Sequence, residues 1–88
     1  MTDEEIIHIM NDRMAREFEI DPAIMTPDKR LIEDLGMDSL DFVDLVIVLQ
    51  DAFGVKLRDE PKIRGIVTLG DLQNLVLDKK RQLEAQGK

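Results

Sequence analysis

The stretch Leu35-Gly36-Met37-Asp38-Ser39-Leu40 decides the fold, because it combines a turn with the start of a helix. Its glycine permits the turn, Asp38 is a favoured N-cap residue, and Asp41 stands three positions further on, as in a capping box. An apolar-rich segment follows, and Gly54 stands where a glycine commonly ends a helix. The pattern predicts a helix over residues 39–53.

Two further segments carry helix-start signals. Thr2-x-x-Glu5 is a capping-box pattern, and apolar residues recur after it at spacings of one, three and four. A first helix is therefore predicted from about residue 3 to 18. Thr68-x-x-Asp71 opens a last helix, which we expect to fray into the charged tail 79–88.

The connections between these helices are long. Residues 19–38 contain two prolines and are predicted to be mostly loop, whereas residues 55–67 are expected to hold one short helical turn. The fold class is all-α, a small antiparallel bundle of three main helices plus one short helix. We expect one domain over residues 1–88, with a core of about 3–78. Apolar residues available to tie the first loop to that core are Ile20, Ile24, Leu31, Ile32 and Leu35.

Composition excludes several classes of function. A chain of 88 residues has room for one modest core, and nineteen acidic against twelve basic residues give a net charge of −7. This charge argues against binding to nucleic acid or to an anionic membrane. The chain has no cysteine and one histidine, so we expect no metal site and no disulfide. Its apolar runs are too short to insert in a membrane. The acidic first residues differ from the basic start of a signal peptide, so we expect a cytoplasmic protein. A chain of this size has little room for a deep catalytic cleft, so we expect that it is not an enzyme.

The helix over residues 39–53 has two apolar faces when its residues are placed at about 100° intervals. The natural core face carries Phe42, Leu45, Val46, Leu49 and Phe53. The opposite side carries Leu40, Asp44, Ile47 and Asp51, with Val43 at its edge. Scattered exposed apolar residues are normal on any surface. The alternative is a docking face, on which apolar residues supply buried area and acidic residues attract a basic partner.

Ser39 is the only serine in the chain and stands at the first position of this helix. A phosphate ester there would meet unpaired backbone N–H groups and the positive end of the helix dipole. Asp38 and Asp41 oppose such a group by charge repulsion, although acidic residues early in a helix also stabilise it. A simple helix-start serine is the other interpretation.

The same stretch, Leu35-Gly36-Met37-Asp38-Ser39-Leu40, resembles the signature of the acyl carrier proteins. The resemblance covers almost the whole chain and includes the opening amphipathic helix, the long loop, Phe53-Gly54 and the segment 66–71. It implies an acyl-carrier-like fold. It also implies that Ser39 is the attachment point of 4′-phosphopantetheine, joined as a phosphodiester by a phosphopantetheinyl transferase that uses coenzyme A.

In this family the acyl group hangs as a thioester from the thiol of that arm and is presented to fatty-acid, lipid or polyketide-type biosynthetic enzymes. Because the chain has no cysteine, a reactive sulfur has to come from a cofactor. The resemblance implies docking of acyl-transfer and condensing enzymes with basic patches, and a monomer is expected. The positions that match the family's docking residues are Asp38, Leu40, Asp41, Val43, Asp44, Ile47 and Asp51. Residues that would line an acyl-chain pocket, although as core residues they need no ligand, are Phe42, Val46, Leu49, Phe53, Ile66 and Leu72.

Some positions depart from the family pattern. Gln50 stands where fatty-acid carriers usually have a glutamate, and Lys62-Ile63-Arg64-Gly65 inserts a residue and adds basic charge. The choice between the housekeeping fatty-acid pathway and a dedicated lipid or polyketide pathway therefore stays open. The alternative function is an acidic helical docking module that is never modified. A hydrolase is disfavoured, because the Gly-x-Ser-x-Gly elbow is absent and His8 would be the only histidine base.

Overall fold

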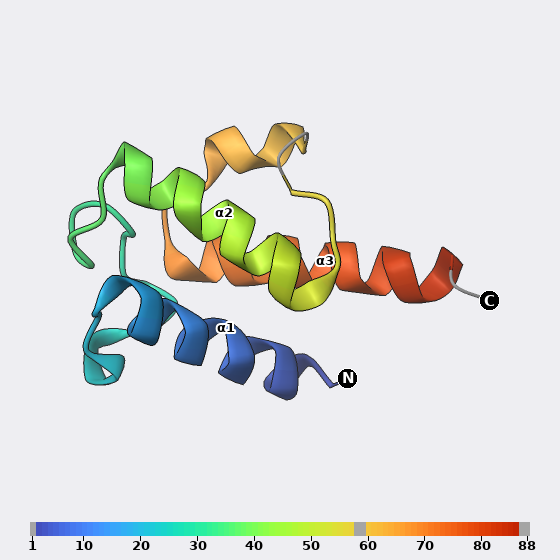
Figure 1. Cartoon of the computed structure of the whole chain (residues 1–88), viewed down its shortest axis with the longest axis horizontal. Helices are drawn as coiled ribbons and strands as arrows, with labels where there is room; N and C mark the ends of the chain where they lie inside the picture. Colours follow the sequence, from blue (N-terminus) through green and yellow to red (C-terminus); the bar gives the residue numbers. More distant parts are fainter. Residues whose placement is uncertain (1, 58–59, 87–88) are drawn as a thin grey trace.

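The computed structural model describes residues 2–57 and 60–86, and in that part of the chain helices dominate (Figure 1). No strand occurs among these residues apart from an isolated bridge between Arg30 and Thr68. The predicted all-α fold is confirmed, and the expected short turn near residue 60 is a 3-10 helix. The elements are α1 (Asp3–Phe18), η1 (Pro22–Ile24), α2 (Ser39–Phe53), η2 (Pro61–Gly65) and α3 (Leu69–Gln86).

The direction of the chain alternates through the long connections. In Figure 1, α1 runs opposite to α2 and α3, while α2 and α3 run the same way. The segment between them carries η2, which returns along α2 before α3 begins. This arrangement brings the start of α2, the last residues of η2 and the start of α3 towards the same end of the molecule (Figure 1).

Helix ends are fixed by the predicted capping interactions. The Asp38 carboxylate accepts the backbone N–H of Asp41 at 2.8 Å, and the Asp41 carboxylate accepts the N–H of Asp38 at 3.2 Å. Thr2 and Glu5 form the equivalent reciprocal pair at the start of α1. Gly54 ends α2 in the left-handed conformation at φ 66°, where its N–H donates to the Gln50 carbonyl at 2.8 Å. A glycine adopts this conformation without the strain of a side chain.

The core lies between the three long helices. Each contributes side chains with no exposed surface, since burial of apolar area is the main favourable term in folding. These side chains include Met10 and Met14 from α1, Leu45 and Leu49 from α2, and Leu72 and Val76 from α3. The loop contributes Ile20, Leu31 and Leu35 as predicted, and also Met25 and Met37. The prediction was wrong for Ile24 and Ile32, which are 41% and 55% exposed.

Backbone hydrogen bonds join the loop before α2 to the start of α3. The N–H of Leu31 donates to the Val67 carbonyl, and the N–H of Leu69 donates to the Lys29 carbonyl, each at 2.9 Å. The N–H of Gly70 donates to the Pro27 carbonyl at the same distance. A Cβ at position 70 would lie 3.0 Å from that oxygen, so the glycine permits the close approach.

The end of α3 differs from the prediction of fraying at Lys79, since the helix continues to Gln86. Three contacts hold this part of the helix against the rest of the chain. Lys79 pairs with Glu60, the Lys80 Nζ donates to the Phe53 carbonyl at 3.3 Å, and Arg81 pairs with Asp3 at 2.6 Å. Residues 87–88 of the predicted tail lie outside the described residues.

Candidate functional site

Ser39 is the first residue of α2, and its side chain is exposed. The segment before it is anchored, because Leu35 and Met37 are buried and the Met37 N–H donates to the Leu31 carbonyl at 3.1 Å. Gly36 makes the intervening turn at φ 75°. The loop therefore presents the serine outward from a fixed base.

The Ser39 hydroxyl differs from the threonine hydroxyls in its hydrogen bonding. The three threonines of the chain all use their hydroxyls within the fold: Thr2 and Thr68 cap helices, and Thr26 donates to Asp28 at 2.5 Å. Ser39 makes no side-chain hydrogen bond with any residue that the structure describes. This hydroxyl is therefore accessible from solvent and has no hydrogen-bond partner among the described residues.

A hollow of about 410 Å³ opens beside the serine. We call it the Ser39 hollow; its lining is Arg30, Leu31, Ile32, Glu33, Ser39, Phe42, Ile63, Arg64, Ile66 and Val67. Arg30 is already paired with Glu33 at 2.8 Å and with Asp34 at 3.4 Å. Arg64 makes no ion pair with a residue of the described ranges. A phosphodiester on Ser39 fits this setting, because the Arg64 guanidinium borders the same hollow and has no ion-pair partner among the described residues.

The docking face predicted on α2 is exposed except at Asp41, which is half-buried. It consists of Asp38, Leu40, Asp41, Val43, Asp44, Ile47 and Asp51. Leu40 is 76% exposed, Val43 55% and Ile47 42%, while Leu45, Val46, Leu49 and Phe53 are buried on the other side of the helix. The prediction of two apolar faces is confirmed, with Phe42 half-buried at the boundary.

The four acidic residues of the docking face divide into two pairs. The carboxylates of Asp38 and Asp41 accept each other's backbone N–H groups. Capping of α2 therefore explains the presence of these two acids. Asp44 and Asp51 are exposed and make no hydrogen bond or ion pair through their side chains with any described residue. Since no described residue pairs with Asp44 or Asp51, their charges are available to a partner.

Gln50 faces the fold rather than a partner. Its side-chain carbonyl accepts the N–H of Leu57 at 2.8 Å, which ties α2 to the loop that follows it. The Gln50 side chain therefore has a structural role in the fold. Compared with the family's usual glutamate, it lacks the negative charge but still accepts the hydrogen bond from Leu57.

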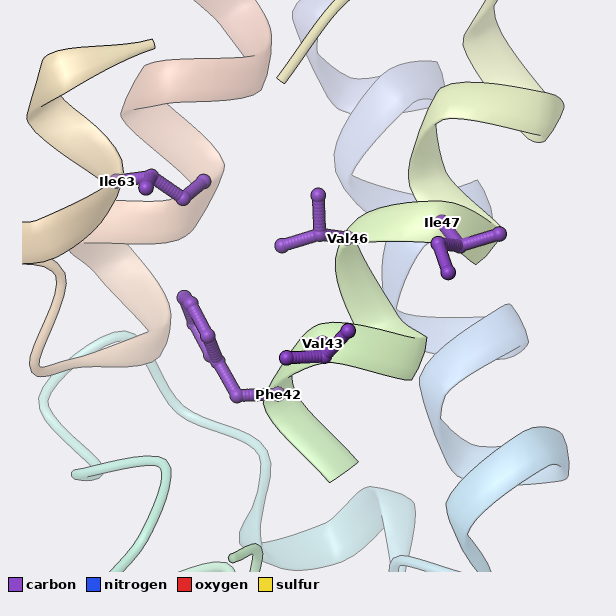
Figure 2. Close-up of a pocket in the computed structure, with 5 residues that line it drawn as sticks. All are labelled: Phe42, Val43, Val46, Ile47 and Ile63. Atoms are coloured by element: carbon purple, nitrogen blue, oxygen red, sulfur yellow. The ribbon is translucent and has the colours of Figure 1, made fainter. Parts of the chain in front are cut away.

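A second hollow, of about 350 Å³, lies between α2 and η2 (Figure 2). We call it the α2 hollow; the side chains that line it are all apolar and belong to Phe42, Val43, Val46, Ile47 and Ile63. Val43 and Ile47, predicted for docking, thus also border this space. Ile63 was missed as a site residue, because its place beside α2 depends on the path of η2 along that helix, which no local sequence signal sets.

The six predicted acyl-pocket residues belong to or pack against one hydrophobic core, but they do not all line one hollow. Phe42 and Val46 line the α2 hollow, and Ile66 lines the Ser39 hollow. Leu49, Phe53 and Leu72 are 0%, 4% and 0% exposed and line neither of these hollows, because they pack within the core. Their contribution to an acyl pocket stays a prediction.

Two features are absent from the described ranges, 2–57 and 60–86. No helix there is long and apolar enough to cross a membrane. No cluster of three or more histidine, aspartate or glutamate side chains there is arranged to hold a metal ion.

Comparison with known proteins agrees with this geometry. Residues 11–76 match the family described as the phosphopantetheine attachment site. The chain is 39% identical over 67 residues to an acyl carrier protein of Helicobacter pylori, a match that covers 76% of this chain and 85% of the relative. It is also 39% identical over 72 residues to acyl carrier protein 2 of Ralstonia nicotianae, covering 82% and 88%.

The fold and the match define a helical domain that carries a covalent phosphopantetheine group. The chain belongs to the acyl carrier proteins. It carries acyl groups on the phosphopantetheine arm and works with acyl-transfer and biosynthetic enzymes.

Proposed function

We propose that Ser39 is the residue to which 4′-phosphopantetheine is attached. The observation that carries this proposal is the exposed, unbonded hydroxyl at the first residue of α2, inside the segment that matches the attachment-site family. When bound, the group supplies the thiol that holds the acyl chain as a thioester. The protein's own residues present the attachment point, offset its charge and bind partners, so we assign no catalytic step to them.

Arg64 supports the attachment of an anionic group at this position. Its side chain borders the same hollow as Ser39, whereas the carboxylates of Asp38 and Asp41 are turned to backbone N–H groups. The start of α2 adds the positive end of a helix dipole. A phosphodiester at Ser39 would therefore be stabilised on two sides.

The docking face is proposed as the surface that phosphopantetheinyl transferase, acyl-transfer enzymes and condensing enzymes contact through basic patches. Leu40 stands beside the serine and exposes more of its side chain than Val43 or Ile47. Asp44 and Asp51 lie on the same helix with their charges unpaired among the described residues. Apolar contact would then supply most of the binding energy, while the acids orient the partner.

The acyl chain is proposed to shelter in the α2 hollow, which is lined by apolar side chains alone. Burial removes methylene groups from water, at about 0.8 kcal/mol for each group. Phe42 and Val46 supply part of this lining, and Ile66 borders the space next to Ser39.

The biological setting of the carrier is the last part of the proposal. We propose a cytoplasmic, monomeric, single-domain carrier over residues 1–88 that serves fatty-acid, lipid or polyketide-type enzymes. The flexible phosphopantetheine arm suits a small carrier that visits several enzymes. Tethering raises the effective concentration of the acyl group at each enzyme that the carrier binds.

The test uses a fluorescent coenzyme A derivative, magnesium and a broad-specificity phosphopantetheinyl transferase. We expect the wild-type chain to become labelled and Ser39→Ala to remain unlabelled, with the same helical circular dichroism. Ser39 is exposed, so its truncation leaves the core intact. Equal labelling of both chains would place the attachment elsewhere. A folded wild-type chain that no transferase labels would favour the unmodified docking module.

A further inference from the structure

The Ser39 hollow and the α2 hollow have two lining residues in common, Phe42 and Ile63. Phe42 lies on α2, three residues after Ser39, and Ile63 lies on η2. In Figure 2 the Phe42 ring projects from α2 towards η2, and the Ile63 side chain projects from η2 into the same space. The two side chains therefore stand where one hollow meets the other.

The two hollows differ in chemistry on either side of this pair. The Ser39 hollow has a partly charged lining, which includes Arg30, Glu33 and Arg64. Beyond the pair, the α2 hollow is lined by Val43, Val46 and Ile47, all apolar. A hydrocarbon chain gains more from the second space than from the first, because charged groups lose hydration when an apolar ligand covers them.

The contacts of η2 allow the pair to separate. Glu60, the N-cap of η2, forms an ion pair with Lys79 of α3, and the backbone hydrogen bonds of η2 are local. Within the part of the chain that the structure describes, no hydrogen bond or ion pair joins η2 to α2. Phe42 and Ile63 are both only half-buried. Ile63 can thus move away from α2 without breaking a polar contact between described residues of the two elements, while Gln50 of α2 holds Leu57 and Lys79 of α3 holds Glu60.

We propose that Phe42 and Ile63 form a gate between the Ser39 hollow and the α2 hollow, and that this gate selects the acyl groups that the protein shelters. The inference rests on the proposed attachment at Ser39. Straight saturated chains pass the gate when Ile63 moves, whereas polar or branched groups stay in the Ser39 hollow. The width of the gate, and not only the volume behind it, then sets the specificity for cargo.

The test measures how well the protein protects a bound thioester. Octanoyl-phosphopantetheine is loaded from octanoyl coenzyme A by a transferase, and loading is verified by intact mass. Hydroxylamine then attacks the thioester carbonyl, which gives the hydroxamate and the free thiol of the arm. A sheltered chain reacts slowly, because only its exposed fraction is cleaved. The variants are Ile63→Ala and Phe42→Ala, which open the gate, and Ile63→Phe, which narrows it.

Val43→Ala is the matched control, because Val43 lines the α2 hollow but not the Ser39 hollow. If the opened gate lets about two more methylene groups leave water, cleavage slows by about tenfold. We expect this slowing for Ile63→Ala and for a folded Phe42→Ala, faster cleavage for Ile63→Phe, and no slowing for Val43→Ala.

Two other outcomes would separate a failure of the gate from a failure of the proposed attachment at Ser39. If all alanine variants are cleaved at the wild-type rate or faster, Phe42 and Ile63 are simply walls of the pocket and the gate is overturned. If the folded wild-type chain accepts no group at Ser39, the proposed attachment fails, and the gate fails with it.

Discussion

Leu40 provides a quantitative test of the docking face. Its side chain is 76% exposed, although full burial of a leucine contributes about 1.5–3 kcal/mol. About three quarters of that contribution, roughly 1–2 kcal/mol, is therefore available to a partner that covers the residue. Leu40→Ala should weaken transferase docking by roughly 5- to 30-fold. The free energy of unfolding should fall by less than about 1 kcal/mol, since little of the side chain is buried in the free protein.

The assay varies the unmodified chain as the substrate of a phosphopantetheinyl transferase at saturating coenzyme A. We expect the apparent KM to rise and the urea midpoint to stay nearly constant. Leu83→Ala is the matched control, because Leu83 is a 40% exposed leucine on α3. An unchanged KM for Leu40→Ala would refute the reasoning, and so would an equal rise for Leu83→Ala.

Three further predictions concern charge, packing and pH. Asp44→Lys should raise the transferase KM roughly fivefold at low salt and less at high salt, whereas Glu84→Lys, with the same charge change near the end of α3, should not; a salt-independent effect would contradict this. Gly70→Ala should lower the free energy of urea unfolding by about 1 kcal/mol, because contact with Pro27 outweighs the usual helix gain of alanine over glycine; a more stable variant would disprove the contact. Backbone N–H groups of Thr68 and Val67 lower the pKa of Asp71, so its stabilisation is present above the unfolded pKa and is lost as pH falls through the folded value. Asp71→Asn should therefore flatten the acid limb of a thermal-unfolding series below about pH 4, and an unchanged limb would exclude this source.

The features around α2 were predictable because they depend on local chemistry. Asp38 and Gly54 fix the ends of the helix through caps that depend on residues a few positions apart. The exposed Leu40 and the buried Leu45 follow from helical periodicity alone. The resemblance then connected Ser39 with a cofactor that the remaining residues do not specify.

The features that the sequence did not predict depend on contacts between distant segments. Ile63 faces α2 only because η2 returns along that helix, and no local pattern sets this path. Gln50 accepts the backbone N–H of Leu57, seven residues away. The sequence alone does not show this contact, so Gln50 was interpreted only as the loss of a docking charge. Lys80 and Arg81 hold the end of α3 through contacts with Phe53 and Asp3. These partners lie far away in the sequence, so the charged tail alone does not predict the contacts.

The most direct test of the central claim is intact-protein mass spectrometry of the chain after incubation with coenzyme A, magnesium and a transferase. Fragmentation then locates the added group. The account predicts a gain of one phosphopantetheine on the fragment that contains Ser39, and no gain for Ser39→Ala. A folded wild-type chain whose mass stays unchanged with several transferases, or an adduct on another residue, would contradict it.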